Sequence, residues 1–340
     1  MTEPVQKAMR MMTRPAHWSL WEGVFWGASL FVLALFPSKA LLFSQIAIMG
    51  LFALSLDLIL GYAGIVSLGH AAFFGVGAYA AGLMAKHGLG DPVLGLFGAA
   101  LVAACIGFVT SFLLLRGSDL TRLMVTLGIA LMLFEMANRF ASITGGADGL
   151  QGMMVQPVLG LFAFDLFGRT AYFYSLAVVW ILFLLARRLV HSPFGLSLRA
   201  VKGNTLRAGA IGISSATRLV AIYTVSAAYA GIAGALSAQT TQLVSLDVLD
   251  FHRSADVMLV LVIGGVGWLY GGLIGAIIFG LMQDWLAGIT PQYWEFWIGL
   301  VLVALVLIGH GRLQDFFNRA VTRVFPKASD PSSSSQRGAL

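Results

Sequence analysis

The chain has 340 residues, of which 59% are hydrophobic and only 11% are charged, and its mean hydropathy is +0.87. A soluble domain has about 45–50% apolar and about 25% charged residues, so this composition excludes an ordinary water-soluble enzyme. About 200 apolar residues would fill about ten membrane helices of about 20 residues each. Little chain remains for a fused ATPase, sensor or receptor domain. We therefore expect an all-α, polytopic membrane protein.

Apolar runs interrupted by polar residues, Gly or Pro predict ten transmembrane helices. The first run, over 18–36, is followed directly by another apolar run, so it is not expected to be a cleavable signal peptide. The predicted spans lie near residues 18–37, 40–60, 63–85, 92–115, 120–140, 172–189, 218–238, 254–268, 270–288 and 293–310.

The distribution of basic residues predicts an N-in, C-in orientation. In that orientation 16 of the 21 Lys and Arg residues face the cytoplasm, as the positive-inside rule requires. The net charge of +6 is explained in the same way and requires no nucleic acid. The predicted organisation is a cytoplasmic N-terminus over 1–17, a transmembrane domain over 18–310 and a cytoplasmic tail over 311–340. The Ser-rich end of that tail predicts disorder.

Two segments between the spans are expected to lie outside the membrane. The external loop, 141–171, begins with a Gly-rich stretch over 144–149 that is typical of turns. The cytoplasmic loop, 190–217, carries basic residues and no acidic residue. A loop of this kind can present a short helix to a soluble partner, or it can simply be a solvated basic loop.

Two clusters of glycines indicate places where membrane helices break. Glycines in membrane helices serve close helix packing, but they can also end a helix and expose backbone groups to a substrate path. His70 fits a packing residue better than a ligand, whereas Asp57, Asp256 and Asp284 lie near span ends and are secondary candidates for a path. The path candidates are Gly61, Gly64, Ser67, Gly69, His70, Gly264, Gly265 and Gly267.

The sequence contains no motif for chemistry of its own. It has no phosphate-binding loop, no His-Glu-x-x-His motif and no paired Cys or His for a metal, and Cys105 is its single cysteine. We therefore expect no catalytic, cofactor-binding or metal-binding residue. Energy for transport would come from an ion gradient or from another subunit.

Several stretches resemble the permease subunits of branched-chain amino acid ABC importers. The clearest is 61–75 (Gly-Tyr-Ala-Gly-Ile-Val-Ser-Leu-Gly-His-Ala-Ala-Phe-Phe-Gly). The resemblance covers residues 40–310, and it is greater to the member designated M of the paired permeases than to the member designated H. The other matching stretches are 144–150, 192–195, 198–200, 208–213, 226–236 and 264–267.

The resemblance implies a multi-pass permease domain over 18–310 in the bacterial inner membrane. It implies a second homologous permease, two cytoplasmic ATPase subunits that bind ATP and Mg²⁺, and an external substrate-binding protein. This chain would form half of the path for branched-chain or related hydrophobic amino acids and would bind no cofactor. The contacts that couple it to the ATPases would be Ser192, Phe194, Gly195, Arg199, Lys202, Gly209 and Gly212.

The sequence departs from the family pattern at two places and leaves other functions open. Residues 202–205 (Lys-Gly-Asn-Thr) stand where the family usually has an acidic stretch, and Gly272 replaces a usual proline. Relatives that transport urea or short-chain amides share the same signatures. From another class, a gradient-driven secondary transporter would need no ATPase partner, and an integral membrane enzyme would need a catalytic constellation that the sequence lacks.

Overall fold

A computed structural model describes residues 20–114, 117, 119–165 and 167–308. Within these ranges every regular element is a helix, and the β-type pairings are two isolated bridges. The predicted all-α class is therefore confirmed. The predicted N-terminal segment 1–17 and the tail 311–340 lie outside the described residues.

Each of the ten predicted spans corresponds to one helix of the described chain. The boundaries agree within a few residues, with one exception at residues 63–70. The helices are α2 (Leu20–Leu35), α3 (Ala40–Ala63), α4 (Ala71–Lys86), α5 (Pro92–Leu114), α6 (Asp119–Arg139), α8 (Arg169–His191), α11 (Ser215–Thr241), α12 (Phe251–Gly264), α13 (Leu269–Ile289) and α14 (Trp294–Ile308).

Six of these helices are long and apolar enough to cross a membrane by length and composition: α3 together with the preceding turn η2 (Pro37–Lys39), α5, α6, α8, α11 and α13. Helices α2 and α4 are apolar but shorter, with 16 residues each. The protein is thus a polytopic membrane protein.

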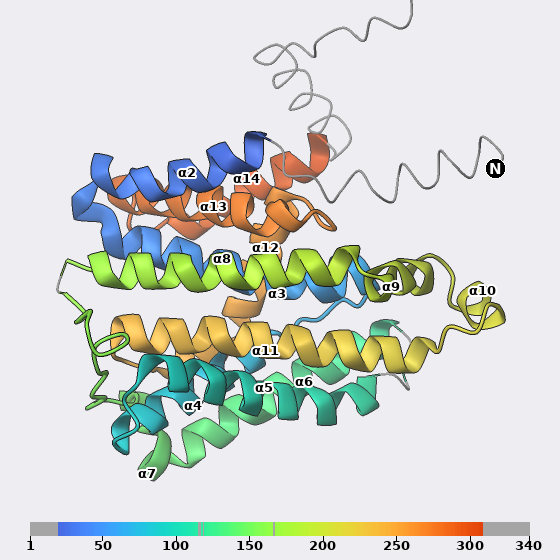
Figure 1. Ribbon diagram of the computed structural model, residues 1–340, viewed down its shortest axis with the longest axis horizontal. Coiled ribbons are helices and arrows are strands. Elements are labelled where there is room, and N and C mark those ends of the chain that lie inside the picture. Colours follow the sequence, from blue (N-terminus) through green and yellow to red (C-terminus); the bar gives the residue numbers. More distant parts are fainter. Residues whose placement is uncertain (1–19, 115–116, 118, 166, 309–340) are drawn as a thin grey trace, which may run out of the picture. The chain divides into compact units, whose positions relative to one another are not determined.

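The chain divides into two compact units, Met1–Met282 and Gln283–Leu340. Helices α3 and α11 form the centre of the first unit: 83% and 67% of the residues in their most apolar stretches are buried. Helix α11 contacts α3, α4 and α5 along its length (Figure 1). The corresponding fractions for α5 and α6 are only 28% and 17%, so these two helices lie at the periphery. The described part of the second unit holds the end of α13 and α14.

Small residues allow the central helices to approach closely. A Cβ at Gly231 on α11 would lie 2.8 Å from the carbonyl oxygen of Ala99 on α5. One at Gly234 would overlap the carbonyl oxygen of Phe74 on α4. Hydrophobic burial does not drive helix association within lipid, so contacts of this kind supply packing energy instead.

Both predicted extramembrane loops contain short helices. The 141–171 segment forms α7 (Ala141–Thr144) and η3 (Gly146–Asp148) before α8 begins. Leu150 in this segment pairs with Val244, which follows α11, through a backbone bridge. The 190–217 segment forms α9 (Pro193–Gly203) and α10 (Thr205–Ala210).

Candidate functional site

Helix α9 is fixed at its start by three neighbouring residues. The Ser192 hydroxyl accepts a hydrogen bond from the backbone N–H of Gly195, and Pro193 occupies the first turn, where its missing N–H is not needed. A Cβ at Gly195 would overlap the carbonyl oxygen of Val190 at the end of α8. The glycine therefore permits the tight turn that folds α9 back onto α3, α8 and α11.

Helix α10 begins where α9 ends and lies beyond the ends of α8 and α11 (Figure 1). Asn204 ends α9 and caps α10, because its side chain accepts from the N–H of Arg207 at 2.9 Å. Leu206 and Ile211 are 85% and 74% exposed. The predicted coupling residues Gly209 and Gly212 have open space around them. Gly212 has a φ of 84°, so its role is conformational.

The first predicted helix break lies at residues 64–70. Helix α3 ends at Gly64, which has a φ of 74°, and Ile65 N–H donates to Ile59 O at 3.0 Å. The expected span 63–85 was therefore wrong at its start, because α4 begins only at Ala71. Irregular backbone at membrane depth requires hydrogen-bond partners from surrounding protein.

Side chains from two other helices supply those partners. The Thr126 hydroxyl on α6 accepts from Leu68 N–H at 3.3 Å, and the Ser254 hydroxyl on α12 accepts from Ala71 N–H at 2.9 Å. Gly69 packs so closely on α6 that a Cβ there would overlap the Thr126 carbonyl oxygen. The break is thus held between α6 and α12.

Ser67 and His70 are enclosed within this break. His70 is 0% exposed and stacks on Phe52, with ring centroids 5.5 Å apart. The Ser55 hydroxyl donates to Phe52 O at 2.6 Å, so it accepts from His70 Nε2 at 2.8 Å, which assigns the imidazole proton to Nε2. These contacts are those of a packing residue. Ser67 Oγ and His70 Nδ1 have no hydrogen-bond partner within the described chain.

The second predicted break separates α12 from α13. Gly265 and Gly267 have φ values of 101° and 81°, which side chains rarely permit. A Cβ at Gly264 would overlap the carbonyl oxygen of Gly271. The glycines therefore allow the chain to turn and α13 to return close against α12.

The coupling segment and the two breaks meet at the end of α3. Lys202 on α9 donates from Nζ to the carbonyl oxygen of Gly61 at 2.6 Å. The guanidinium of Arg199 lies 5.3 Å from the ring centroid of Tyr62. The backbone N–H of Gly267 donates to Asp57 Oδ1 at 2.7 Å. We call this set the α3–α9 junction; its members are Asp57, Gly61, Tyr62, Arg199, Lys202 and Gly267.

The junction brings together four of the predicted site residues, Gly61, Arg199, Lys202 and Gly267, and adds Asp57 and Tyr62. Asp57 was a secondary candidate at a span end, but it lies within α3 and is 0% exposed. One feature of the sequence could have linked Asp57 to this site: it lies four residues before Gly61, and that spacing places both residues on one helix face. The other two secondary candidates for a path, Asp256 and Asp284, lie on α12 and α13.

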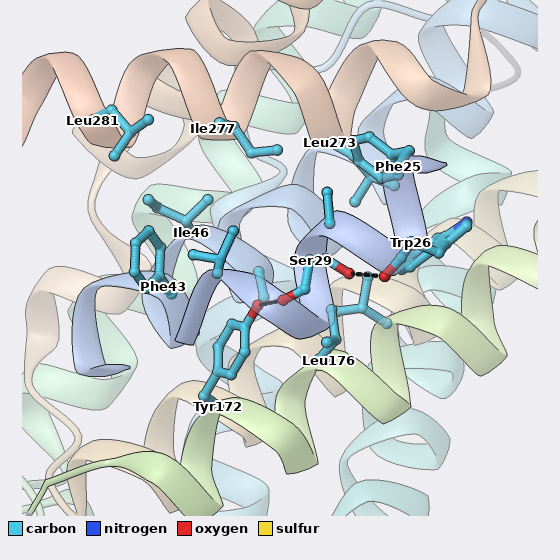
Figure 2. Close-up of a pocket in the computed structure, with 14 residues that line it drawn as sticks. Phe25, Trp26, Ser29, Phe43, Ile46, Tyr172, Leu176, Leu273, Ile277 and Leu281 are labelled. Atoms are coloured by element: carbon cyan, nitrogen blue, oxygen red, sulfur yellow. Dashed lines mark hydrogen bonds between the residues drawn. The ribbon is translucent and has the colours of Figure 1, made fainter. Parts of the chain in front are cut away.

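The first unit also contains an apolar cavity of about 230 Å³ between α2, α3, α8 and α13 (Figure 2). Of its polar groups, the Ser29 hydroxyl donates to Trp26 O at 2.7 Å and the Tyr172 hydroxyl donates to Ser29 O, while Trp26 Nε1 has no hydrogen-bond partner among the described residues. The described residues that line it are all uncharged. A zwitterionic amino acid would lose its hydration there without compensation. The cavity is therefore unsuited to hold such a substrate.

Comparison with known proteins defines the class. Residues 40–306 match the family model described as "Branched-chain amino acid transport system / permease component". The chain belongs to this family of transport-system permease components. One relative that it matches is the "Inner membrane ABC transporter permease protein YjfF" of Escherichia coli, at 34% identity over 44% of this chain and 47% of the relative. No solved structure matches the chain.

Individual relatives include permeases that are named for different substrates. The chain is 27% identical over 282 residues to the "High-affinity branched-chain amino acid transport system permease protein LivM" of Escherichia coli, covering 75% of this chain and 64% of LivM. It is 28% identical over 221 residues to the "Galactose/methyl galactoside import permease protein MglC" of Salmonella typhimurium, covering 61% and 63% of the two chains. The chain thus spans less than two thirds of the length of these relatives.

Proposed function

We propose that this chain is the transmembrane permease subunit of an ABC importer in the bacterial inner membrane. It forms half of the translocation path for branched-chain or related hydrophobic amino acids, and a second homologous permease forms the other half. Two cytoplasmic ATPase subunits bind ATP and Mg²⁺ and drive transport, and an external binding protein delivers the substrate. Membership in the permease family supports the assignment as a permease subunit. The arrangement of α9 and α10 supports the proposal that this segment couples the permease to the ATPases.

The two short helices divide the coupling task between them. Helix α9 is packed on the bundle, with Leu198 and Val201 buried. A displacement of α9 therefore moves α3, which it contacts. Helix α10 presents Leu206 to solvent, and Ile211, which directly follows the helix, is exposed as well. Burying two such apolar side chains in a partner is favourable by about 1.5–3 kcal/mol for each one that becomes fully buried. Helix α10 is therefore the docking element for an ATPase subunit.

Transport follows from movement of this segment. The partner ATPases displace α10 and α9 when they close, and Lys202 and Arg199 pass the displacement to the last turn of α3 through Gly61 and Tyr62. Both helix breaks adjoin this turn, so the displacement of α3 moves them as well. We expect this movement to open the path alternately outward and inward. The external segment 141–171 receives the binding protein, which selects the ligand. This chain hydrolyses no ATP.

The family description favours a branched-chain amino acid substrate over the alternatives. Identity to LivM and to MglC is nearly equal, at 27% and 28%, so identity by itself does not select the substrate. A urea or short-chain amide permease of the same family is the alternative within the class. A gradient-driven secondary transporter is the alternative outside it.

Isolation of the native complex tests the proposal. The tagged protein is extracted from its own membrane in mild detergent, and the proteins that copurify are identified by mass spectrometry. We expect a second permease and ATPases with phosphate-binding loops. The complex is then reconstituted, and uptake of leucine, valine, urea, acetamide and galactose is compared. A chain that purifies alone and still supports ionophore-sensitive uptake would overturn the ABC assignment.

A further inference from the structure

Asp57 is a buried carboxylate in a helix that is apolar enough to span the membrane. Ionisable side chains in such positions are costly and are retained for a purpose. Its Oδ1 atom accepts the backbone N–H of Gly267 at 2.7 Å, whereas Oδ2 has no hydrogen-bond partner among the described residues. Asp57 therefore joins α3 directly to the turn between α12 and α13.

Gly61 allows the turn to approach Asp57. It lies one helical turn after Asp57 on the same face of α3. A Cβ at position 61 would overlap Asp57 Oδ1 and would lie 2.7 Å from the Gly267 nitrogen. Any larger residue at 61 would separate the carboxylate from the turn.

The same turn of α3 receives Lys202. Ile65 N–H, which a continuing helix would direct to Gly61 O, bonds to Ile59 O instead because α3 ends there. The Gly61 carbonyl is thus available to accept from Lys202 Nζ. A continuous polar connection runs from α9 through α3 to the second helix break.

We propose that Asp57 is a positioning residue that makes the α12–α13 turn follow the movement of α9. The inference rests on the proposed function, in which α9 moves with the ATPases. When α9 pulls on the last turn of α3, the hydrogen bond that Gly267 N–H donates to Asp57 draws Gly267 with it. Without that bond α3 moves and the turn does not, so ATP is hydrolysed without productive opening of the path.

The test uses the complete importer in proteoliposomes and measures substrate molecules transported per ATP hydrolysed. Asp57→Leu removes the acceptor, and we expect this ratio to fall at least tenfold while basal ATPase activity stays within about twofold of wild type. Asp57→Asn keeps an acceptor oxygen for Gly267, so we expect it to retain at least half of the wild-type ratio. Gly61→Ala keeps Asp57 but forces the turn away, and we expect it to behave like Asp57→Leu.

Ser44→Val is the matched control. Ser44 is also buried in α3, and its hydroxyl is 3.2 Å from the Ser175 hydroxyl on α8, away from the junction. We expect its transport ratio to be unchanged. A wild-type ratio in Asp57→Leu, or in Gly61→Ala if Asp57→Leu does not assemble, would overturn the inference. A wild-type complex that neither binds ATPases nor couples transport to ATP would instead overturn the proposed function.

Discussion

Gly195 and Gly209 lie in one short segment but differ in what surrounds them. A Cβ at Gly195 would overlap the Val190 carbonyl oxygen and lie 2.7 Å from Val190 Cα, both of which are backbone atoms that cannot rotate away. Around Gly209 nothing lies within 4 Å of the equivalent position. The requirement for glycine at 195 therefore comes from the turn between α8 and α9.

Gly195→Ala is expected to displace α9 from the bundle and to lower transport-coupled ATPase activity about tenfold, which corresponds to about 1.4 kcal/mol. Membrane insertion, measured by the amount of protein in washed membranes, should be unchanged. Gly209→Ala makes the same chemical change in open space and should leave both quantities unchanged. Equal coupled activity in the two variants would contradict a role for the α8–α9 turn.

Arg199 and Tyr62 provide a second contact between α9 and α3. Their cation–π interaction is worth about 0.5–1 kcal/mol at an exposed site, so Arg199→Ala should lower coupled ATPase activity about two- to fivefold. Tyr62→Phe keeps the aromatic face and should retain activity, whereas Tyr62→Leu should match Arg199→Ala. The double variant Arg199→Ala/Tyr62→Leu should be no worse than either single variant. Additive losses would show that the two residues act separately.

The site residues differ in how far the sequence could reveal them. Gly195, Arg199 and Lys202 were predicted because the stretch that contains them resembles the cytoplasmic loop of the permease family. The role of Asp57 was not predicted, because its hydrogen-bond partner is the backbone N–H of Gly267, 210 residues further along the chain. A contact to a backbone N–H leaves no mark in the identity of the residue that provides it.

At the scale of elements, the sequence predicts helices well where apolar runs continue and poorly where an apolar chain leaves the helix. The glycines at 61, 64 and 69 indicated a break in this region, but the apolar run placed the start of the third span at residue 63. The backbone instead turns at Gly64 and is held by Thr126 and Ser254. Those partners come from α6 and α12, and only the folded bundle brings them to the break.

Helix α10 is too short to be stable without its cap and its neighbours, yet its exposed apolar side chains point to a partner. Leu206→Asp should weaken copurification of the ATPase subunits at least tenfold, because a carboxylate cannot be buried in an apolar groove without a large penalty. Copurification of the second permease should be unchanged. This is measured by quantitative mass spectrometry of the purified complex.

The control for that variant is Leu161→Asp, which makes the same change at an 80% exposed leucine of the 141–171 segment. This residue is expected to lie on the other side of the membrane, so ATPase recovery should stay at the wild-type level. Loss of the ATPases in both variants would indicate a general defect of assembly and would remove α10 as the docking element.

At the scale of the whole molecule, the peripheral helices leave apolar surface that the described part of the first unit does not cover. Only 28% and 17% of the most apolar stretches of α5 and α6 are buried, whereas α3 and α11 bury most of theirs, and α3 carries the junction. In the proposed mechanism, a moving α9 therefore acts on α3, whose most apolar stretch is 83% buried. Such a helix transmits displacement because packed interiors deform little.

The proposed mechanism also requires α10 and the 141–171 segment to lie on opposite sides of the membrane. Cys105 is the single cysteine, so Cys105→Ala gives a cysteine-free background into which Leu206→Cys or Leu161→Cys is introduced. A membrane-impermeant maleimide should label Leu161→Cys in spheroplasts and Leu206→Cys only after the membrane is permeabilised. The excess of basic residues at 190–217 predicts this result. Labelling of Leu206→Cys in sealed spheroplasts would reverse the orientation, and α10 would then be unable to reach a cytoplasmic ATPase.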